Sequence, residues 1–272
     1  MGPTSQNQFE PPGTLVLGGF TLWIDTKEGQ AMKIGVIGCG TIASAVVRGI
    51  AHDGHQITVS RRSTQQSHAL SATFDCVSIA DNQTVLNQSD VIFLGLIAEQ
   101  ASDILSDLKF HPDHQVISLM AGADLEKIAM LVGPAKNISI MIPFPNIATG
   151  GSPVLALGDI ALIENIFTPD NTVFPLENPE QLQACLAAQA VLSPTLKLVN
   201  TAETWLQEHC PGVAEGFLSL LISSNLSGQT TGDALQALDT PGGYNQRLRN
   251  HMEDVGMSDA LKQGLTALTD KT

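Results

Sequence analysis

The sequence predicts an α/β fold, a doubly wound parallel sheet followed by an all-α domain. Two observations predict it. Up to about residue 176, short apolar β-favouring runs alternate with segments whose apolar residues repeat at helical spacing, and from Pro179 onward only the helical spacing remains. The chain has 272 residues, enough for two domains. We therefore divide it into an N-terminal extension, a sheet domain and a helical domain, at residues 1–31, 32–176 and 177–272.

The first strand of the expected sheet runs into a glycine-rich turn. The apolar run 34–37 meets Gly-x-Gly-x-x-Ala at 38–43, and a segment with helical spacing follows to residue 50. In such a unit the first glycine takes the turn, and the second lets the backbone approach a pyrophosphate on the positive end of the helix. The sequence therefore predicts a dinucleotide site. Its turn residues are Gly38, Cys39, Gly40, Thr41 and Ile42.

The end of the second strand indicates which dinucleotide is bound. Residues 56–60 are expected to form this strand, and Ser60 is followed by Arg61 and Arg62. Sites that prefer NAD place an acid here against the ribose 2′-hydroxyl, and this chain has none. Guanidinium groups suit a 2′-phosphate because they donate paired hydrogen bonds and keep their charge. The sequence favours NADP(H), with NAD(H) left open, and the alternative is a solvated charged turn.

The remaining elements follow from the same two patterns. Further strands are expected at 74–79, 90–96, 115–119 and 137–141, with edge strands at 153–157 and 172–174. Helices are expected at 99–108, 125–131, 179–192, 194–209, 213–226, 231–238, 244–255 and 258–268. The helix at 213–226 is apolar over too much of its surface for a lone bundle. This predicts a homo-oligomer formed through the helical domain, and the alternative is that these helices only cover their own sheet.

Composition excludes several classes of function. A net charge of −14 argues against binding nucleic acid or a membrane surface, and no apolar run reaches the length of a membrane span. Residues 1–31 are rich in Gly, Pro, Gln and Thr, so we expect a disordered extension outside the fold, and the alternative is a structured arm. No Cys-x-x-Cys pair occurs, so we expect no metal site and a reducing, cytoplasmic compartment. The four cysteines are Cys39, Cys76, Cys185 and Cys210.

From residue 32 to about 256 the chain resembles the pyrroline-5-carboxylate reductase family. The opening at 33–40 is similar to that of the family, and Val-Ser-Arg-Arg-Ser at 59–63 is similar to its Val-Ser-Asn-Arg-Ser. Asn82 stands eight positions before Asp90, as in the family's adenosine-contacting loop, and Thr-Pro-Gly-Gly at 240–243 also matches. The order and spacing of these pieces carry the resemblance.

The resemblance implies a dimer built on the helical domain. NADPH on the sheet would deliver hydride to a cyclic imino acid held by the Pro-Gly-Gly loop, reducing 1-pyrroline-5-carboxylate to proline. Backbone N–H groups ahead of a helix suit a carboxylate, although Pro-Gly-Gly is also an ordinary turn between helices. The implied cofactor residues are Asn82, Leu96, Ile97, Ala121 and Gly122. The implied substrate residues are Thr240, Gly242, Gly243, Tyr244 and Asn245, with Thr240 and Asn245 as the catalytic candidates.

Three departures from the family pattern bear on the substrate. Residues 96–99 lack the family's lysine, residues 141–145 lack its asparagine, and Asn245 replaces a threonine. An asparagine amide donates hydrogen bonds but is a poor proton source. We therefore expect cofactor binding to persist while substrate choice differs. The alternatives are a different imine, a non-catalytic NADPH-binding paralogue, and a β-hydroxyacid dehydrogenase. The last needs a catalytic lysine after the domain junction, where lysines are sparse.

Overall fold

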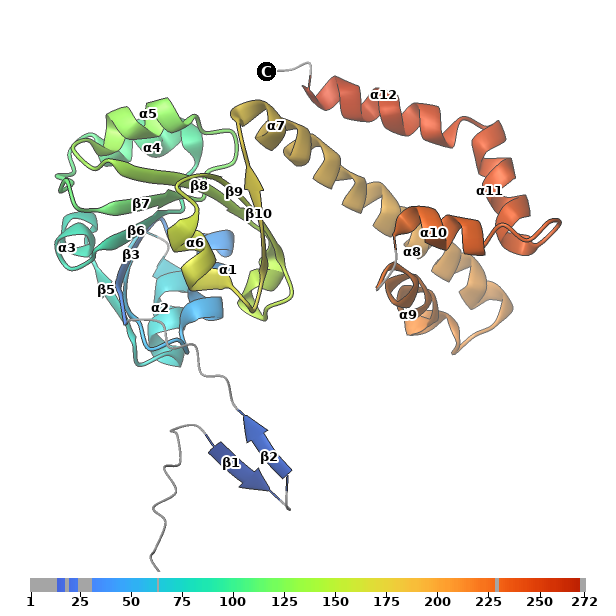
Figure 1. Cartoon of the computed structure of the whole chain (residues 1–272), viewed down its shortest axis with the longest axis horizontal. Coiled ribbons are helices and arrows are strands. Elements are labelled where there is room, and N and C mark those ends of the chain that lie inside the picture. Colours follow the sequence, from blue (N-terminus) through green and yellow to red (C-terminus); the bar gives the residue numbers. More distant parts are fainter. Residues whose placement is uncertain (1–13, 18–19, 24–30, 63, 228–229, 270–272) are drawn as a thin grey trace, which may run out of the picture. The chain divides into compact units, whose positions relative to one another are not determined.

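The computed structural model describes residues 14–17, 20–23, 31–62, 64–227 and 230–269. The chain divides into two compact units, Met1–Glu177 and Asn178–Thr272, so the division falls beside the one expected at 176/177. Among the described residues, unit 1 contains all the strands and unit 2 contains only helices (Figure 1).

Unit 1 is built on an eight-stranded sheet with the order β10-β9-β8-β7-β6-β3-β4-β5. Neighbouring strands are parallel except β8 and β9, which are antiparallel. The chain order reverses at β3, and in sheets of this kind ligands bind at the carboxyl ends of the strands near such a reversal. The doubly wound α/β fold is therefore confirmed. The strands are β3 (Lys33–Ile37), β4 (Gln56–Ser60), β5 (Val77–Ala80), β6 (Val91–Leu94), β7 (Gln115–Ser118), β8 (Asn137–Pro143), β9 (Pro153–Gly158) and β10 (Thr172–Leu176).

Helices cover both faces of the sheet (Figure 1). On one face, side chains of β3 and β6 form a buried core with α1, and the rings of Phe93 and Phe167 meet edge to face at 6.2 Å, which places α6 there as well. On the other face α4 packs against α5. The helical elements are α1 (Thr41–Ile50), α2 (Thr64–Thr73), α3 (Asn82–Asn87), α4 (Ala98–Leu105), α5 (Leu125–Val132), η1 (Pro145–Ala148) and α6 (Ala161–Phe167).

The sequence analysis did not predict helix α2, and it therefore placed the start of the third strand too early in the chain. In α2 only Ser67 and Leu70 are buried, so its sequence carries almost no apolar stripe. The prediction that Phe74 opens a strand is wrong. Its N–H donates to the carbonyl of Leu70 and ends the helix, while its ring packs edge-on against His52 at 5.5 Å. The strand begins at Val77.

Part of the N-terminal extension is paired. Strands β1 (Thr14–Leu17) and β2 (Phe20–Trp23) are antiparallel, with Leu15 opposite Leu22. The expected disorder therefore does not extend to these two strands. Residues 1–13, 18–19 and 24–30 lie outside the described part of the chain.

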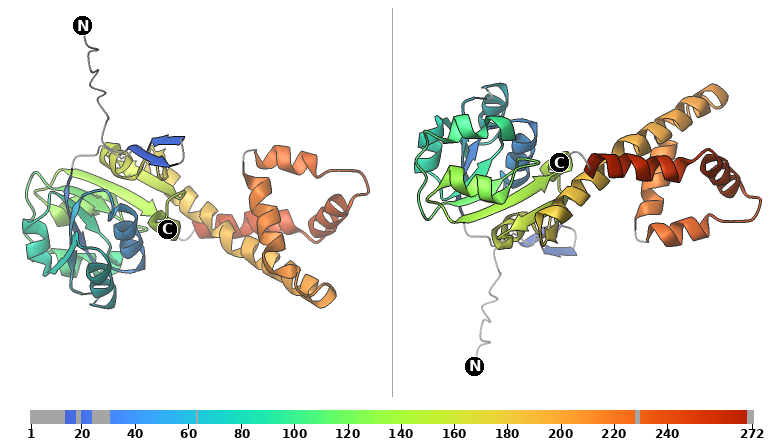
Figure 2. Two further views of the ribbon diagram at one scale, coloured as in Figure 1. Left: turned by 90° about the horizontal axis from the view of Figure 1, so that it is seen from below. Right: turned by 90° about the horizontal axis from the view of Figure 1, so that it is seen from above.

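Unit 2 is entirely helical. Its elements are α7 (Pro179–Ala188), η2 (Gln189–Val191), α8 (Leu192–His209), α9 (Ala214–Leu226), α10 (Thr231–Ala237), α11 (Tyr244–Asp254) and α12 (Met257–Thr269). Figure 2 shows α8 continuing the direction of α7, and α12 packs against α7. Many apolar side chains of the unit are exposed, among them Leu196, Trp205 and Leu220 at 58%, 61% and 70%. Exposed apolar surfaces of this kind mark sites of contact with another protein surface.

The continuous helical stretch Pro179–His209 contains an 18-residue window with a mean hydropathy of 1.3, which is long and apolar enough to cross a membrane by length and composition. This corrects the expectation that no segment reaches that length. Pro194, Lys197, Asn200 and Glu203 interrupt it, and groups of this kind are expensive in hydrocarbon. Only 11% of the window is buried inside the chain, and one such helix is weak evidence for a membrane span.

Candidate functional site

The turn between β3 and α1 is held in place by packing and one buried hydrogen bond. Gly38 has a φ of +85°, in the left-handed region that favours glycine. Its N–H donates to Ser60 Oγ at 2.9 Å. A Cβ built on Gly38 would come within 2.5 Å of the carbonyl oxygen of Gly95. The loops after β3, β4 and β6 are therefore locked together at the carboxyl edge of the sheet.

Gly40 stands in the opposite situation. A Cβ built on it would meet nothing within 4 Å, so packing inside the protein gives no reason for a glycine there. Gly40 is the residue before α1, and its position has no side-chain cap. The first N–H groups of a helix have no acceptor within the helix and carry its positive dipole end. The open space over this helix end fits a pyrophosphate.

The other turn residues contribute in different ways. Cys39 is fully buried, its sulfur lies 3.6 Å from Ser44 Oγ, and burial raises the pKa of its thiol. It can therefore offer a ligand only its backbone. Thr41 is exposed and Ile42 is half-buried in the first turn of α1. The first turn of this helix thus presents backbone donors and the Thr41 hydroxyl.

The two arginines after β4 are exposed and differ in their surroundings. Arg62 Nη2 donates to Gln100 Oε1 on α4 at 3.1 Å. Because β3 lies between β4 and β6, this hydrogen bond joins segments on either side of the glycine turn. Arg61 acts through its charge on the carboxylate of Asp81, which follows β5. The pKa of Asp81 is lowered chiefly by hydrogen bonds from the backbone and side chain of Thr84, and the charge of Arg61 adds to this.

The remaining predicted cofactor residues also follow strands of the same sheet. Asn82 is half-buried and begins α3, whose cap is Asp81. Leu96 is half-buried and Ile97 is 60% exposed just before α4. Ala121 and Gly122 are exposed after β7. The structure therefore gathers the whole predicted cofactor set at the carboxyl edge, after β3, β4, β5, β6 and β7.

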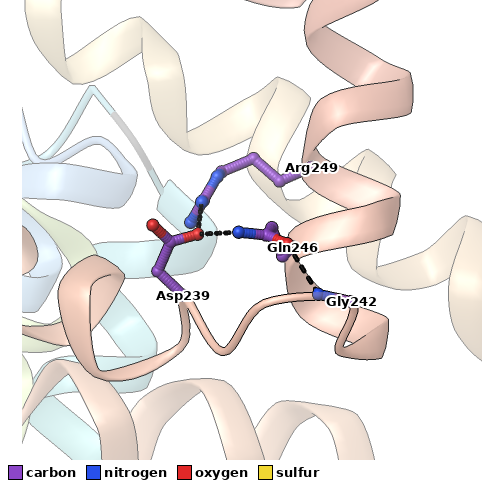
Figure 3. Close-up of polar contacts among 4 residues, drawn as sticks. All are labelled: Asp239, Gly242, Gln246 and Arg249. Carbon is purple, nitrogen blue, oxygen red and sulfur yellow. Dashed lines mark hydrogen bonds and ion pairs between the residues drawn. The ribbon is translucent and has the colours of Figure 1, made fainter.

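The predicted substrate loop lies in unit 2, between α10 and α11 (Figure 3). Gly242 has a φ of +74°. Its N–H donates to Gln246 Oε1 at 2.9 Å, and the N–H of Gly243 donates to the carbonyl of Thr240 at 2.9 Å. This differs from the expectation that both N–H groups are exposed for a carboxylate. The tight turn satisfies one donor and the first turn of α11 satisfies the other.

A chain of polar contacts continues from this loop (Figure 3). Gln246 Nε2 donates to Asp239 Oδ1 at 3.0 Å, and Arg249 forms an ion pair with the same oxygen. The hydrogen bonds from Gln246 and Arg249 lower the pKa of Asp239, so this carboxylate is ionised at neutral pH. The loop is thus tied to α11 through two side chains of that helix.

The side chains proposed for catalysis are accessible. Thr240 and Asn245 are exposed, and Tyr244 is 89% exposed. Thr240 precedes Pro241, and Asn245 lies in the first turn of α11. Each can hydrogen-bond a ligand through its hydroxyl or amide group. Among the described residues, no cluster of three or more His, Cys, Asp or Glu could hold a metal ion.

The sequence analysis did not predict which side chains bind Arg62 and Asp239. Gln100 binds Arg62 from a distant helix, and no local signal points to it. Gln246 and Arg249 are three residues apart and so lie on one face of α11. That spacing was the available signal for their shared contact with Asp239.

The first half of the chain is similar in sequence to known proteins. Residues 33–122 match the family model described as "NADP oxidoreductase coenzyme F420-dependent". Pyrroline-5-carboxylate reductase 3 of Xenopus laevis is 28% identical over 138 residues, which are 48% of this chain and 50% of that protein. The chain therefore matches the curated relative over about half of that protein's length.

Two solved structures share the fold over most of the chain. The 1-pyrroline-5-carboxylate reductase of Streptococcus pyogenes superposes with a TM-score of 0.74 at 22% identity, covering 89% of this chain and 98% of that one. An imine reductase from Pseudomonas sp. superposes with a TM-score of 0.60 at 20% identity, covering 89% and 91%.

The fold and the glycine turn define the class, that of proteins with a dinucleotide-binding sheet domain, and residues 33–122 are similar to NADP oxidoreductases. Within that class, the first half of the chain is similar in sequence to pyrroline-5-carboxylate reductases, and the solved structures show that it shares their fold.

Proposed function

We propose that this protein uses NADPH to reduce the C=N bond of a cyclic imino acid, with 1-pyrroline-5-carboxylate as substrate and proline as product. The observation that carries the proposal is the open helix end over Gly40, where packing requires no glycine and a pyrophosphate fits. The two arginines after β4, where the sequence has no acid at the end of the strand, support the phosphorylated nucleotide. The names of the relatives support the imine substrate.

The reaction asks little acid–base chemistry of side chains. NADPH, when bound, would supply a hydride to the imine carbon and would become NADP⁺. The π electrons of the C=N bond become a lone pair on nitrogen, which takes up one proton, so the product is the saturated amine. The N–H groups at the start of α1 and the guanidinium groups of Arg61 and Arg62 hold the nucleotide. Thr240 and Asn245 orient the ring, and the proton comes from solvent, since an amide is a poor donor.

The proposal is tested by NADPH oxidation with a panel of cyclic imines. We expect turnover of pyrroline-5-carboxylate, and calorimetry should show tighter binding of NADPH than of NADH. The double variant Arg61→Ala/Arg62→Ala tests the role of the two arginines. It should weaken the binding of NADPH and leave the binding of NADH, the internal control, unchanged. A protein that binds neither nucleotide contradicts the proposal.

A non-catalytic NADPH-binding protein is the second candidate. It is favoured by one observation, that the N–H groups of Gly242 and Gly243 already have acceptors within the chain. Tight NADPH binding with no turnover of any imine in the panel selects this candidate over the first.

We also propose that the protein is a cytoplasmic homo-oligomer assembled through unit 2. The support is the exposed apolar surface of its helices and an apolar cavity of about 740 Å³ between α8 and the segment from α11 to α12. Leu198, Val255 and Leu265 are among its lining residues. A second copy of the chain would remove this surface from water.

A further inference from the structure

A cavity of unit 1 lies at the last turn of α1, at the other end of this helix from the glycine turn. Its volume is about 310 Å³, and it is lined from the end of α1, the loop between η1 and β9, and the turn between α6 and β10. Arg48 stands about 10 Å along the helix axis from Thr41, and the cavity shares no lining residue with the predicted cofactor set. It is therefore separate from the nucleotide site. Its lining residues with polar side chains are Arg48, His52, Thr149, Asp170 and Asn171.

The walls of this cavity are fixed by close packing and by a buried hydrogen bond. Gly49 lets α1 approach η1, because a Cβ built on it would come within 2.4 Å of the carbonyl oxygen of Ile147. The N–H of Ser152, just before β9, donates to Asn171 Oδ1 at 3.1 Å, and Asn171 is only 7% exposed. The three segments are thus held together by contacts of the chain itself, and the cavity is preorganised.

Two groups of opposite charge line the cavity without forming an ion pair. Arg48 is half-buried, and no described residue forms a hydrogen bond or an ion pair with its guanidinium group. Asp170 is exposed and lines the cavity from the turn before β10. A guanidinium group carries five N–H donors, and a carboxylate accepts several hydrogen bonds. Each group can therefore bind a ligand group of the opposite charge.

We propose that this cavity binds a small α-amino acid as its zwitterion, with the ligand carboxylate on Arg48 and the ligand ammonium group on Asp170. A simple anion on Arg48 would be repelled by Asp170, and a simple cation on Asp170 would be repelled by Arg48. A zwitterion satisfies both groups at once. The cavity volume is at the lower end of the range for ligand pockets, which limits the ligand to a small molecule. Binding here takes no part in the reduction of an imine.

Calorimetry with matched probes tests whether both charges are read. Glycine, L-alanine, L-serine and L-glutamine are the amino acids; propionate is L-alanine without its ammonium group, and ethylamine is L-alanine without its carboxylate. At least one amino acid should bind with a Kd of about 1 mM or tighter. Propionate and ethylamine should bind at least about tenfold more weakly than that amino acid. The proposal fails if none of the four amino acids binds, or if either single-charge probe binds as tightly as they do.

Two variants test whether the binding occurs in this cavity. Arg48→Met removes the guanidinium group and keeps an unbranched side chain, so it should weaken amino-acid binding about tenfold and leave ethylamine binding no weaker. Asp170→Asn should weaken amino-acid binding about threefold, because an exposed charge is screened by water, and should tighten propionate binding. A damaged fold would weaken the binding of every probe, so the contrast between probes distinguishes a loss of charge from a loss of structure.

Lys136→Met, at an exposed position of unit 1 outside the cavity, is the matched control and should leave all affinities unchanged. Thermal melting shows whether each variant folds, and Asp170→Asn decides by itself if Arg48→Met does not. Unchanged amino-acid affinity in the folded variants overturns the proposal. None of these measurements uses NADPH or an imine, so their outcome is independent of the proposed function.

Discussion

At the residue scale, the glycine motif owes its glycines to two different physical causes. Gly38 is required by the fold, since a Cβ there would press on the backbone of Gly95 at 2.5 Å and the φ of +85° disfavours any other residue. Gly40 is not required by the fold, because a Cβ there would meet no protein atom within 4 Å. The first glycine shapes the turn, and the second leaves room for a ligand.

Exchanging each glycine for alanine should therefore separate stability from binding. Gly40→Ala should melt near the wild-type temperature and bind NADPH roughly tenfold more weakly or worse, because its Cβ enters the phosphate space. Gly38→Ala should lose about 1–3 kcal/mol of unfolding free energy. Thermal melting and calorimetry measure both effects. Wild-type NADPH affinity in Gly40→Ala would contradict the dinucleotide site.

The arginines after β4 make a second prediction at this scale. Arg62→Ala should weaken NADPH binding roughly tenfold, the worth of a charge-assisted hydrogen bond to phosphate, and leave NADH binding unchanged. Gln100→Leu, which removes the partner of Arg62 without removing the charge, is the comparison variant. Titration of nucleotide fluorescence measures both. An equal loss for NADPH and NADH in Arg62→Ala would show that the arginine does not read the 2′-phosphate.

At the scale of elements, local sequence patterns located most strands and helices, but they did not show how neighbouring strands pair. Periodicity located β4 and α9 within a residue, because burial on one face imposes a spacing on the sequence. It missed α2 and α6. It also left open the direction of β9, which pairs antiparallel with β8. Pairing direction depends on where the connection returns to the sheet, which local sequence does not encode.

The turn before β7 carries a prediction about pH. His114 is 5% exposed, and its Nδ1 accepts the N–H of His111 at 3.1 Å, which only a neutral ring can do. Burial, and then the neighbouring charge of His111, lower the pKa of His114 below 6.5. The unfolded chain then binds the proton more readily, so this contribution to stability is complete above about pH 6.5 and is lost as pH falls toward the lowered pKa.

Denaturant unfolding at about pH 7.5 and about pH 5.5 measures this contribution. The wild type should be less stable at the lower pH. His114→Asn, whose Oδ1 can stand in for Nδ1 and does not titrate, should show a smaller pH dependence. An unchanged pH dependence in that variant would exclude His114 as its source.

At the scale of the whole molecule, exposed apolar side chains on unit 2 predict assembly. Leu220 on α9 is 70% exposed. Light scattering should give a mass that is a multiple of 28.7 kDa, and Leu220→Glu should shift it toward the single chain, since a buried charge without a partner opposes association. Met130→Glu, at a 76% exposed position in unit 1, is the control and should leave the mass unchanged. A wild-type mass of one chain contradicts the assembly.

The sequence by itself determined the strand–turn–helix unit and the helical character of unit 2, because each depends on neighbouring residues and their spacing. Only the tertiary structure decided that Gly38 meets Gly95, that Arg62 meets Gln100, and that Gln246 and Arg249 converge on Asp239. These contacts join loops and helices brought together by the packing of the chain. A hydrogen bond between such side chains requires positions in space, which the local pattern of apolar and polar residues leaves undefined.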